Sequence, residues 1–439
     1  MVDASEYKKG RSRDKGLAIK GFELGSQGFL VQREDGDAWL ESDPSYANVI
    51  KPYMNGDDLK EGKWKCYVVD FFGLEQDTAR GYPKAYQHVY DRVVSDRATN
   101  REQRVIRNWW LFRRSGQDLR SALKGMSRFV GTTRTAKFRV FQFLPAHLAA
   151  ESKIVVVATE SAWLLGVLSS RIHVTFATKI GGWLGVGNDP TYNHTDCFNK
   201  FAFPVPNDDV RHRVARLAED LDAHRKRQLI QYPRLSITDM YNVLEMIRSG
   251  EALSTKDKVI HEQGLVSVLK QIHDDLDVSV FDAYGWPHDL NDDEILRRLV
   301  DLNRERAEEE KRGIIRWLRP EYQNPEGTQA ARAAQGALPI EPEATEATAA
   351  TAGAKRSWPK TLPEQAQAVR AVLADQPTGL TPRATGPALS SRQHWARYGH
   401  AQRLGFAGPG PCVEGRSVPP DVIRLTKPIM AKRLLTPMI

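Results

Sequence analysis

The sequence predicts a mixed α/β domain followed by an all-α helical domain, then a flexible, disordered linker and a tail of unassigned fold. Up to about residue 206, short strand-like runs alternate with helical stretches and with turns marked by Gly or Pro. Beyond that point apolar residues recur at helical spacing, and Glu326–Ser357 is rich in Ala, Thr, Glu and Pro without one aromatic residue. The resulting segments are an N-terminal junction, the α/β domain, the helical domain, the linker and the tail, at residues 1–20, 21–206, 207–325, 326–360 and 361–439.

The α/β domain is expected to contain strands at four apolar runs and one buried helix. The strand-like runs are Gly28–Gln32, Cys66–Phe71, Phe138–Phe143 and Lys153–Ala158. The helix is expected over Ser161–Phe176, and its dense apolar run, Trp163–Leu168, indicates that it is buried.

The helical domain is expected from three amphipathic patterns. The first is a stripe at i, i+4, i+7 and i+11, formed by Val210, Val214, Leu217 and Leu221. The same spacing recurs at Leu265, Leu269, Ile272 and Leu276. A third helix is predicted to begin at Asn291, an N-cap residue with a glutamate three positions later, and to present the apolar face Ile295, Leu299 and Leu302.

The composition is that of a globular protein with an excess of basic residues. Of 439 residues, 41% are hydrophobic and 27% charged, and the formal charge is +8. A basic excess favours a polyanionic partner, nucleic acid before an anionic membrane, and leaves a basic soluble enzyme as the alternative. No run approaches the ~20 apolar residues of a membrane span, and Met1–Lys20 lacks the apolar core of a signal peptide. We therefore expect a cytoplasmic protein with no membrane partner. Cys66, Cys197 and Cys412 are far apart and match no zinc spacing, so we expect a reduced protein with no metal site.

A strongly basic segment runs from Arg97 to Arg139. Its twelve basic residues are opposed only by Glu102 and Asp118, so it carries a charge of +10. The first four arginines are spaced to share one side of a helix. Lys and Arg neutralise phosphates and Arg reads guanine edges, so the segment predicts contact with nucleic acid; a merely solvated face is the alternative. The interleaved aromatic residues are expected to be core. The residues predicted to bind DNA are Arg97, Arg101, Arg104, Arg107, Arg113, Arg114, Arg128, Arg134, Lys137 and Arg139.

Several segments, in their order along the chain, resemble landmarks of one family. They are Ile50–Leu59, Asn108–Trp110, Phe201–Pro206, Met240–Asn242, Asp282–Trp286, Leu302–Glu310 and Ile315–Gln323. The family is that of the MmeI-like, S-adenosylmethionine-dependent, adenine-specific DNA methyltransferases of restriction-modification systems. The first three segments resemble its target-recognition region, including an FPFP-like close, and the other four resemble its helical C-terminal region. The resemblance covers about residues 21–325.

The resemblance implies double-stranded DNA as the substrate, S-adenosylmethionine as the methyl donor and adenine N6 as the target. It also implies a methyltransferase domain ahead of the recognition region, and neither the donor-binding glycine motif nor the Asn-Pro-Pro-Phe or -Tyr motif of that domain stands in this sequence. We therefore expect no catalytic residue and no bound cofactor in this chain, with S-adenosylmethionine used by the complete enzyme. The methyltransferase domain is expected in cis, in a longer form, or in trans. The alternative is a non-catalytic DNA-binding specificity subunit or an inactive gene remnant.

Three further groups of residues have both a chemical and a structural explanation. Asn188–Tyr192 resembles an Asp-Pro-Pro-Tyr catalytic motif with a threonine in place of the second proline, and a turn explains the same residues. A complete enzyme that uses this segment is the third alternative. The pair Ser169–Ser170 near His173 has no identifiable acid partner, and helix packing accounts for it. His194 and Cys197 do not make a convincing zinc pair.

Overall fold

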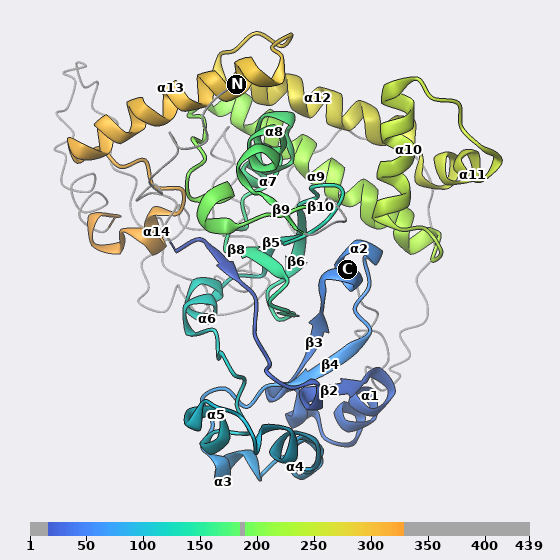
Figure 1. Cartoon of the computed structure of the whole chain (residues 1–439), viewed down its shortest axis with the longest axis vertical. Helices are drawn as coiled ribbons and strands as arrows, with labels where there is room; N and C mark the ends of the chain where they lie inside the picture. Colours follow the sequence, from blue (N-terminus) through green and yellow to red (C-terminus); the bar gives the residue numbers. More distant parts are fainter. Residues whose placement is uncertain (1–15, 185–188, 329–439) are drawn as a thin grey trace, which may run out of the picture. The chain divides into compact units, whose positions relative to one another are not determined.

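The computed structural model describes residues 16–184 and 189–328 (Figure 1). Within them, a region with two small sheets precedes a region made of helices, which confirms the predicted fold class. From residue 329 on, the predicted linker and tail lie outside the described residues. Part of the predicted N-terminal junction is ordered, because Ala18–Lys20 (β1) pairs with the first sheet.

The first sheet is antiparallel throughout, with the strand order β1-β8-β5-β6. Its other strands are β5 (Arg128–Thr133), β6 (Gln142–Pro145) and β8 (Ile154–Val157). All four residues of β8 are buried, as expected for a strand that has a neighbour on either side. The strand predicted at Lys153–Ala158 is therefore confirmed.

The strand predicted at Phe138–Phe143 is displaced toward the C-terminus, since β6 begins only at Gln142. The preceding residues connect β5 to β6 instead of extending the strand. Arg139 within this connection donates hydrogen bonds to the Thr133 carbonyl and to the Pro190 carbonyl (3.0 Å), which ties the connection to the sheet end.

The second sheet has the strand order β2-β4-β3-β7. Its strands are β2 (Leu30–Gln32), β3 (Ile50–Met54), β4 (Cys66–Val69) and β7 (Ala149–Ala150). The pairs β2–β4 and β3–β4 are antiparallel, and β3–β7 is parallel. The strand predicted at Cys66–Phe71 is confirmed. The one predicted at Gly28–Gln32 begins only at Leu30, because Ser26 accepts a hydrogen bond from Gly28 N and caps a short 3-10 turn there.

Short helices surround the second sheet. They are α1 (Arg33–Ser42), α2 (Gly56–Glu61), α3 (Gln76–Ala79), α4 (Pro83–Arg97), α5 (Gln103–Arg107) and α6 (Gln117–Leu123). The segment Ile50–Leu59 forms β3 and the start of α2. Asn55 begins α2 with a capping box, accepting from Asp57 N (2.8 Å) and Asp58 N (2.9 Å) while its own N–H donates to the Asp58 carboxylate.

The single helix predicted over Ser161–Phe176 is two helices, α7 (Ala162–Ser169) and α8 (Arg171–Ile180). The break has a local cause at Ser170, whose backbone is extended and whose hydroxyl donates to the Val167 carbonyl (2.7 Å) and accepts from His173 N (3.4 Å). A serine that can cap a new helix competes with continuation of the old one. The predicted burial of Trp163–Leu168 is confirmed.

After α8 the chain forms a two-stranded antiparallel ribbon of β9 (Trp183–Leu184) and β10 (Asp189–Pro190), followed by the short π-helical turn η5 (His194–Phe198). The helical region comprises α9 (Asp208–Gln231), α10 (Ile237–Ser249), α11 (Thr255–Gly264), α12 (Val266–Tyr284), α13 (Asp292–Lys311) and α14 (Pro320–Gln323). No described helix is both long and apolar enough to cross a membrane.

The helical patterns read from the sequence are largely confirmed. Val214 and Leu221 on α9 are fully buried, and Asn291 caps α13 by accepting from Glu294 N (2.9 Å). The exception is Leu265, which lies at the turn between α11 and α12 with a φ of 44° and is 47% exposed, so it does not belong to the buried stripe of α12. That stripe begins at Val266 and Leu269, both fully buried.

The described residues form two apolar cores. The first lies between the first sheet, α7, α8 and the long helices, and it includes Val157, Phe176 and Leu221. The second surrounds the second sheet and α4, and it includes Phe29 and Val89 (Figure 1). The basic segment predicted to bind DNA therefore spans parts of both cores.

Candidate nucleic-acid interface

The first arginines of the basic segment do not share one helix face, and that prediction is wrong. Arg97 is the last residue of α4, Arg101 lies in the turn that follows, and Arg104 and Arg107 belong to α5. The turn is stabilised by Asn100, whose side-chain oxygen accepts a hydrogen bond from Glu102 N (2.8 Å). This Asx turn ends the helical path just before α5 begins.

Arg97 is a buried structural residue. Its side chain is 1% exposed and donates hydrogen bonds to three carbonyl oxygens, those of Leu24 (2.6 Å), Trp109 (3.0 Å) and Leu111 (2.6 Å). Its guanidinium lies 4.9 Å from the Phe29 ring centroid, and burial lowers its pKa to about 10. A guanidinium enclosed in this way cannot reach a phosphate, so the prediction that Arg97 binds DNA is revised.

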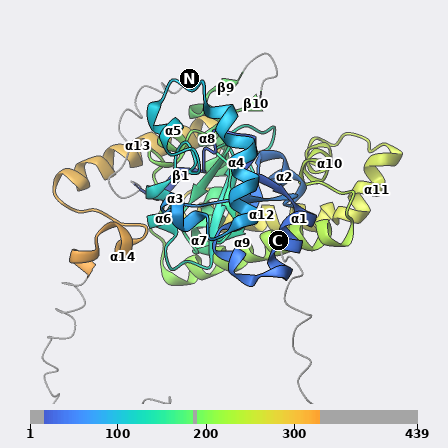
Figure 2. The same ribbon diagram turned by 90° about the horizontal axis from the view of Figure 1, so that it is seen from below.

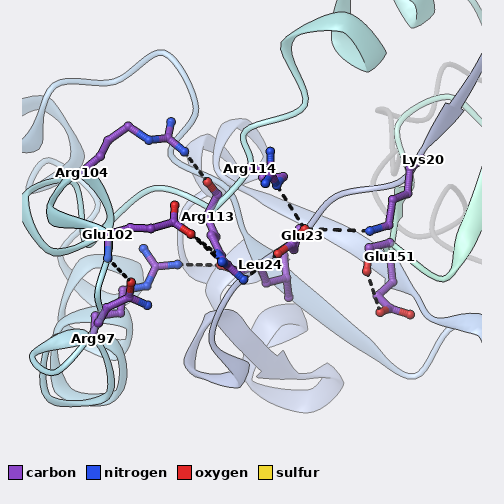
Figure 3. A network of polar contacts seen from close by, with 11 residues as sticks. Lys20, Glu23, Leu24, Arg97, Glu102, Arg104, Arg113, Arg114 and Glu151 are labelled. Atoms are coloured by element: carbon purple, nitrogen blue, oxygen red, sulfur yellow. Dashed lines mark hydrogen bonds and ion pairs between the residues drawn. The ribbon is translucent and has the colours of Figure 1, made fainter.

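Around Arg97 lies a group of ionic residues that we call the Glu23 cluster: Lys20, Glu23, Glu102, Arg104, Arg113 and Arg114 (Figure 3). The Glu23 carboxylate forms ion pairs with three cations, which are Arg113 at 3.0 Å, Arg114 at 3.4 Å and Lys20 at 3.9 Å. Arg113 also pairs with Glu102 (2.5 Å), and its carbonyl accepts a hydrogen bond from Arg104 (2.7 Å). With four cations against two carboxylates, the cluster keeps a positive charge.

The backbone explains why these residues meet although they are about 90 positions apart in sequence. The chain at Glu23–Leu24 runs antiparallel to the chain at Arg113–Arg114, because Arg113 N donates to Leu24 O and Arg114 N to Glu23 O (both 3.1 Å). Hydrogen bonds from Arg113 lower the pKa of Glu102 below its usual value, so this carboxyl remains ionised beside the arginines.

The cluster opens on a surface hollow of about 330 Å³. Its lining includes Lys20, Arg104 and Arg114 together with the polar groups of Ser115 and Gln117. The side chain of Arg114 is 73% exposed although it pairs with Glu23. Cations held in place at an exposed hollow are suited to contact phosphate oxygens.

Three of the four cations at the end of the basic segment connect the first sheet to neighbouring elements. Arg128 pairs with Glu219 of α9 (2.5 Å), and Lys137 pairs with Glu245 of α10 (2.9 Å). Arg139, whose pKa is lowered to about 10 by burial, donates hydrogen bonds to the Thr133 and Pro190 carbonyl oxygens. Of these three, Lys137 alone is exposed.

The charge of +10 read from the segment is therefore reduced by carboxylates from other parts of the chain. Glu23, Asp70, Glu219 and Glu245 pair with Arg113, Arg120, Arg128 and Lys137, respectively. By contrast, the side chains of Arg101, Arg107 and Arg134 make no hydrogen bond or ion pair with any other described residue. These last three, with the exposed cations of the Glu23 cluster, are the candidates that the fold leaves available.

Besides Glu102, two members of the cluster, Lys20 and Glu23, were not among the sequence candidates. Nothing in their local sequence marks them, since a Lys and a Glu three positions apart are common on any surface. Their position became meaningful only once the backbone had placed them against Arg113 and Arg114.

The segment that resembles a catalytic motif is structural in its described part, which begins at Asp189, but it forms β10 and a bridge from Thr191 to Thr135 instead of the expected turn. Tyr192 is fully buried, and its hydroxyl lies 3.0 Å from His173 Nε2. Phe141 contacts its ring edge-to-face at 5.3 Å, and Arg139 lies 5.1 Å from its centroid. A ring enclosed on these sides is unavailable to stack on an extruded adenine.

The remaining polar groups singled out from the sequence are also structural. Ser170 and His173 are linked only as a helix cap, and both are fully buried. Cys197 is buried with its thiol directed at the Ala177 carbonyl (3.7 Å), and burial raises its pKa to about 11. A thiol in this state is a poor metal ligand, because zinc binds the thiolate.

Segments from the helical region fasten to the sheets at defined points. Tyr284 donates to the Ala202 carbonyl (2.8 Å), which joins Asp282–Trp286 to the segment Phe201–Pro206. Arg225 of α9 donates to the Phe141 carbonyl (2.8 Å) and contacts Tyr241 and His273. Polar contacts thus connect the helical region to the chain next to the first sheet.

Comparison with known proteins identifies the α/β region. Residues 14–207 match the family described as MmeI, target recognition domain. This region is similar to the MmeI target-recognition domain, and we call it the recognition domain. The match begins before β1 and ends just before α9, so it contains both sheets and every residue of the Glu23 cluster.

The chain also has a counterpart of known structure over part of its length. The match is to a solved structure titled "Structure of Type IIL restriction-modification enzyme MmeI in complex with DNA has implications for engineering of new specificities". The TM-score is 0.52 at 15% sequence identity, and the match covers 66% of this chain and 35% of that one. It establishes a shared fold, and the present chain spans about a third of the length of that protein. No curated protein matches the chain.

Proposed function

We propose that this chain recognises double-stranded DNA for a site-specific DNA methyltransferase of a restriction-modification or phage-defence system, with adenine N6 as the target. The observation that carries the proposal is the match of residues 14–207 to the MmeI target-recognition domain. The solved relative is described as a complex with DNA, which supports the same class of ligand.

The arrangement of cations fits this role. Arg101, Arg107 and Arg134 are free of internal partners among the described residues, and Arg104 and Arg114 border the hollow at the Glu23 cluster. Phosphate contacts fix the register of a protein on DNA, and base-edge contacts read the sequence. We assign Arg104 and Arg114 to phosphates because their partners hold them in place, which restricts them to one position on the backbone.

The segment nearest to a catalytic motif gives no support for methyl transfer by this chain. It ends in Tyr192, which is buried against Phe141 and His173. We therefore assign the donor and the transfer step to a methyltransferase domain, supplied in cis in a longer form or in trans. This chain would grip the flanking DNA firmly enough to offset the cost of unstacking the target base.

The test is a titration of the purified chain with a fluorescent duplex, followed by anisotropy at several salt concentrations. We expect binding whose affinity falls steeply with salt, because each neutralised phosphate adds about 0.9 to the log–log slope. A matched single strand of the same length serves as control for duplex preference. Absence of binding at low salt would contradict the proposal.

The second candidate function is a non-catalytic DNA-binding specificity subunit, or an inactive gene remnant. Both candidate functions predict DNA binding, so two other observations are needed to distinguish them. An adjacent methyltransferase reading frame, in frame or frame-shifted, in the DNA upstream of the coding sequence favours the first proposal. The chain alone, incubated with tritiated S-adenosylmethionine and mixed-sequence DNA, is expected to transfer no label, and label in the DNA would contradict the assignment of catalysis to another domain.

A further inference from the structure

The β9–β10 ribbon carries the most exposed aromatic side chain among the described residues. Trp183 faces Pro190 across the ribbon, and 59% of its surface is exposed. Tryptophan is highly buried on average in folded proteins, and Tyr192, just past the ribbon, is fully buried. The exposure of Trp183 is therefore unusual and requires an explanation.

The base of the ribbon is held rigidly by its backbone. At Gly181 a β-carbon would lie 2.0 Å from the Thr191 carbonyl oxygen, so only glycine permits this close approach. Gly182 has a φ of 73°, and its carbonyl accepts from both the amide (3.0 Å) and the hydroxyl (3.2 Å) of Thr191. Arg139 donates to the Pro190 carbonyl (3.0 Å).

A second set of contacts joins the same base to the first sheet. Tyr192 N donates to the Arg134 carbonyl (2.6 Å), and Thr135 forms a bridge with Thr191. The buried hydroxyl of Tyr192 contacts His173 of α8. An exposed ring on a fixed support loses little conformational freedom when it binds, which favours its use as an anchor.

The surroundings of the ribbon favour a polyanion. The Arg134 side chain makes no hydrogen bond or ion pair with another described residue, and Lys179, four positions before Trp183, is exposed. The one carboxylate of the described ribbon residues, Asp189, lines a small hollow with Lys60 and Lys137, whose ion pairs are with Asp57 and Glu245. In Figure 2 the ribbon and α5, which carries two of the candidate arginines, both lie toward the top of the view, and Figure 1 shows them apart along the long axis.

We infer that Trp183 of β9 stacks against a base of the bound DNA, an inference that rests on the proposed function. Proteins that bend or open a duplex insert large apolar side chains between base steps, and stacking of an aromatic ring on a base is tolerant of sequence. The flanking cations, Arg134 and Lys179, would contact the phosphates on either side of the inserted ring. Insertion unstacks the base step and locally unwinds the duplex.

The experiment measures affinity and unwinding separately, with the full chain. Affinity for a duplex is taken from anisotropy, and unwinding from the change in linking number of a plasmid relaxed by a topoisomerase in the presence of the protein. Wild type should bind and lower the linking number. Trp183→Ala should bind about 10-fold more weakly and leave the linking number unchanged, whereas Trp183→Phe should retain most of both effects. The matched control is Ile230→Ala, which removes another exposed apolar side chain (64% exposed) from α9.

The outcomes separate the inference from the function on which it rests. If wild type does not bind DNA at low salt, the proposed function fails, and the inference fails with it. If wild type binds but neither unwinds the plasmid nor loses affinity in Trp183→Ala, the inference alone is overturned. That result would also be expected if Trp183 docked against a protein domain. Melting temperatures of all variants confirm that they remain folded.

Discussion

The recognition domain and the helical region contain similar numbers of charged residues but use them differently. Residues 21–206 hold 24 Lys and Arg against 20 Asp and Glu, a net charge of +4, whereas residues 207–325 hold 19 against 24, a net charge of −5. Many helical pairs join residues three or four positions apart, such as Lys311–Glu308. The recognition domain has such local pairs too, for example Lys60–Asp57, but the pairs of its basic segment join residues that are not near neighbours in sequence, such as Arg113 and Glu23.

This difference teaches how a charged stretch of sequence should be interpreted. On a helix the partner of a charge can lie three or four positions away, so the local sequence shows much of the pairing. In a sheet domain the partners come from elsewhere, and a window of strongly positive sequence can be partly neutralised. The positive charge that is available to a polyanion is that of the side chains that the fold leaves unpaired. Here these include Arg101, Arg107 and Arg134.

The largest expected effect on stability comes from a cation that the recognition domain uses internally. Arg97→Ala should lower the free energy of unfolding by roughly 3–5 kcal/mol, because three buried carbonyl oxygens lose their donor. The matched control, Arg101→Ala, removes an exposed guanidinium from the same stretch and should change stability by less than about 0.5 kcal/mol. Urea denaturation measures both. Equal effects would remove the distinction between buried and available arginines.

A pH-dependent effect is expected in the helical region, at Asp277 of α12. Its carboxylate accepts from Arg171 N (2.7 Å) at the start of α8, and burial raises its pKa from 3.8 to about 6. The folded state therefore holds the proton more tightly than the unfolded state, and stability is lost as pH rises from about 4 to about 6. Asp277→Asn should raise the free energy of unfolding above pH 6, by at most roughly 3 kcal/mol, and have little effect near pH 4. Chemical denaturation across this range measures it, and a gain that is the same at every pH would show that ionisation is not its cause.

The smallest effect is expected for the exposed pairs along the helices. Lys311→Ala removes a pair with Glu308 (2.6 Å) in which both side chains are largely exposed. Such pairs contribute about 0.3–0.5 kcal/mol, and DNA affinity should not change. Thermal denaturation and anisotropy of the same variant check the two expectations, and a loss of DNA binding would extend the interface onto α13.

The elements predicted correctly from the sequence are those whose cause is local. The apolar stripe through Val214 and Leu221, the cap at Asn291 and the apolar run of β8 depend on residues within one or two turns or one strand. The helix predicted over Ser161–Phe176 was wrong at one point, because a serine hydroxyl in its middle caps a second helix. Leu265 has helical spacing but lies at a turn with positive φ, which periodicity does not reveal.

The candidate interface was predicted less completely, and the reason is again distance along the chain. The sequence located the basic segment, but it did not show that Arg97 is enclosed by Leu24 and Phe29, about 70 positions earlier. Nor did it show that Lys20 and Glu23 complete the cluster around Arg113. Which arginine is buried depends on backbone carbonyls brought near it by the fold, and these leave no signal in its own neighbourhood.

The central claim is that DNA is held by the available cations of the recognition domain, among them the unpaired Arg101, Arg107 and Arg134, rather than by the positive charge of the chain as a whole. It is tested most directly by comparing two triple variants with the same change in charge. The first is Arg101→Ala, Arg107→Ala and Arg134→Ala; the second is Arg216→Ala, Arg227→Ala and Lys256→Ala, three exposed cations of the helical region without partners among the described residues. The measurement is the log–log salt slope of duplex binding by anisotropy. We expect the first triple to lower the slope by about three and the second to leave it unchanged. Equal slopes for the two triples would contradict the claim.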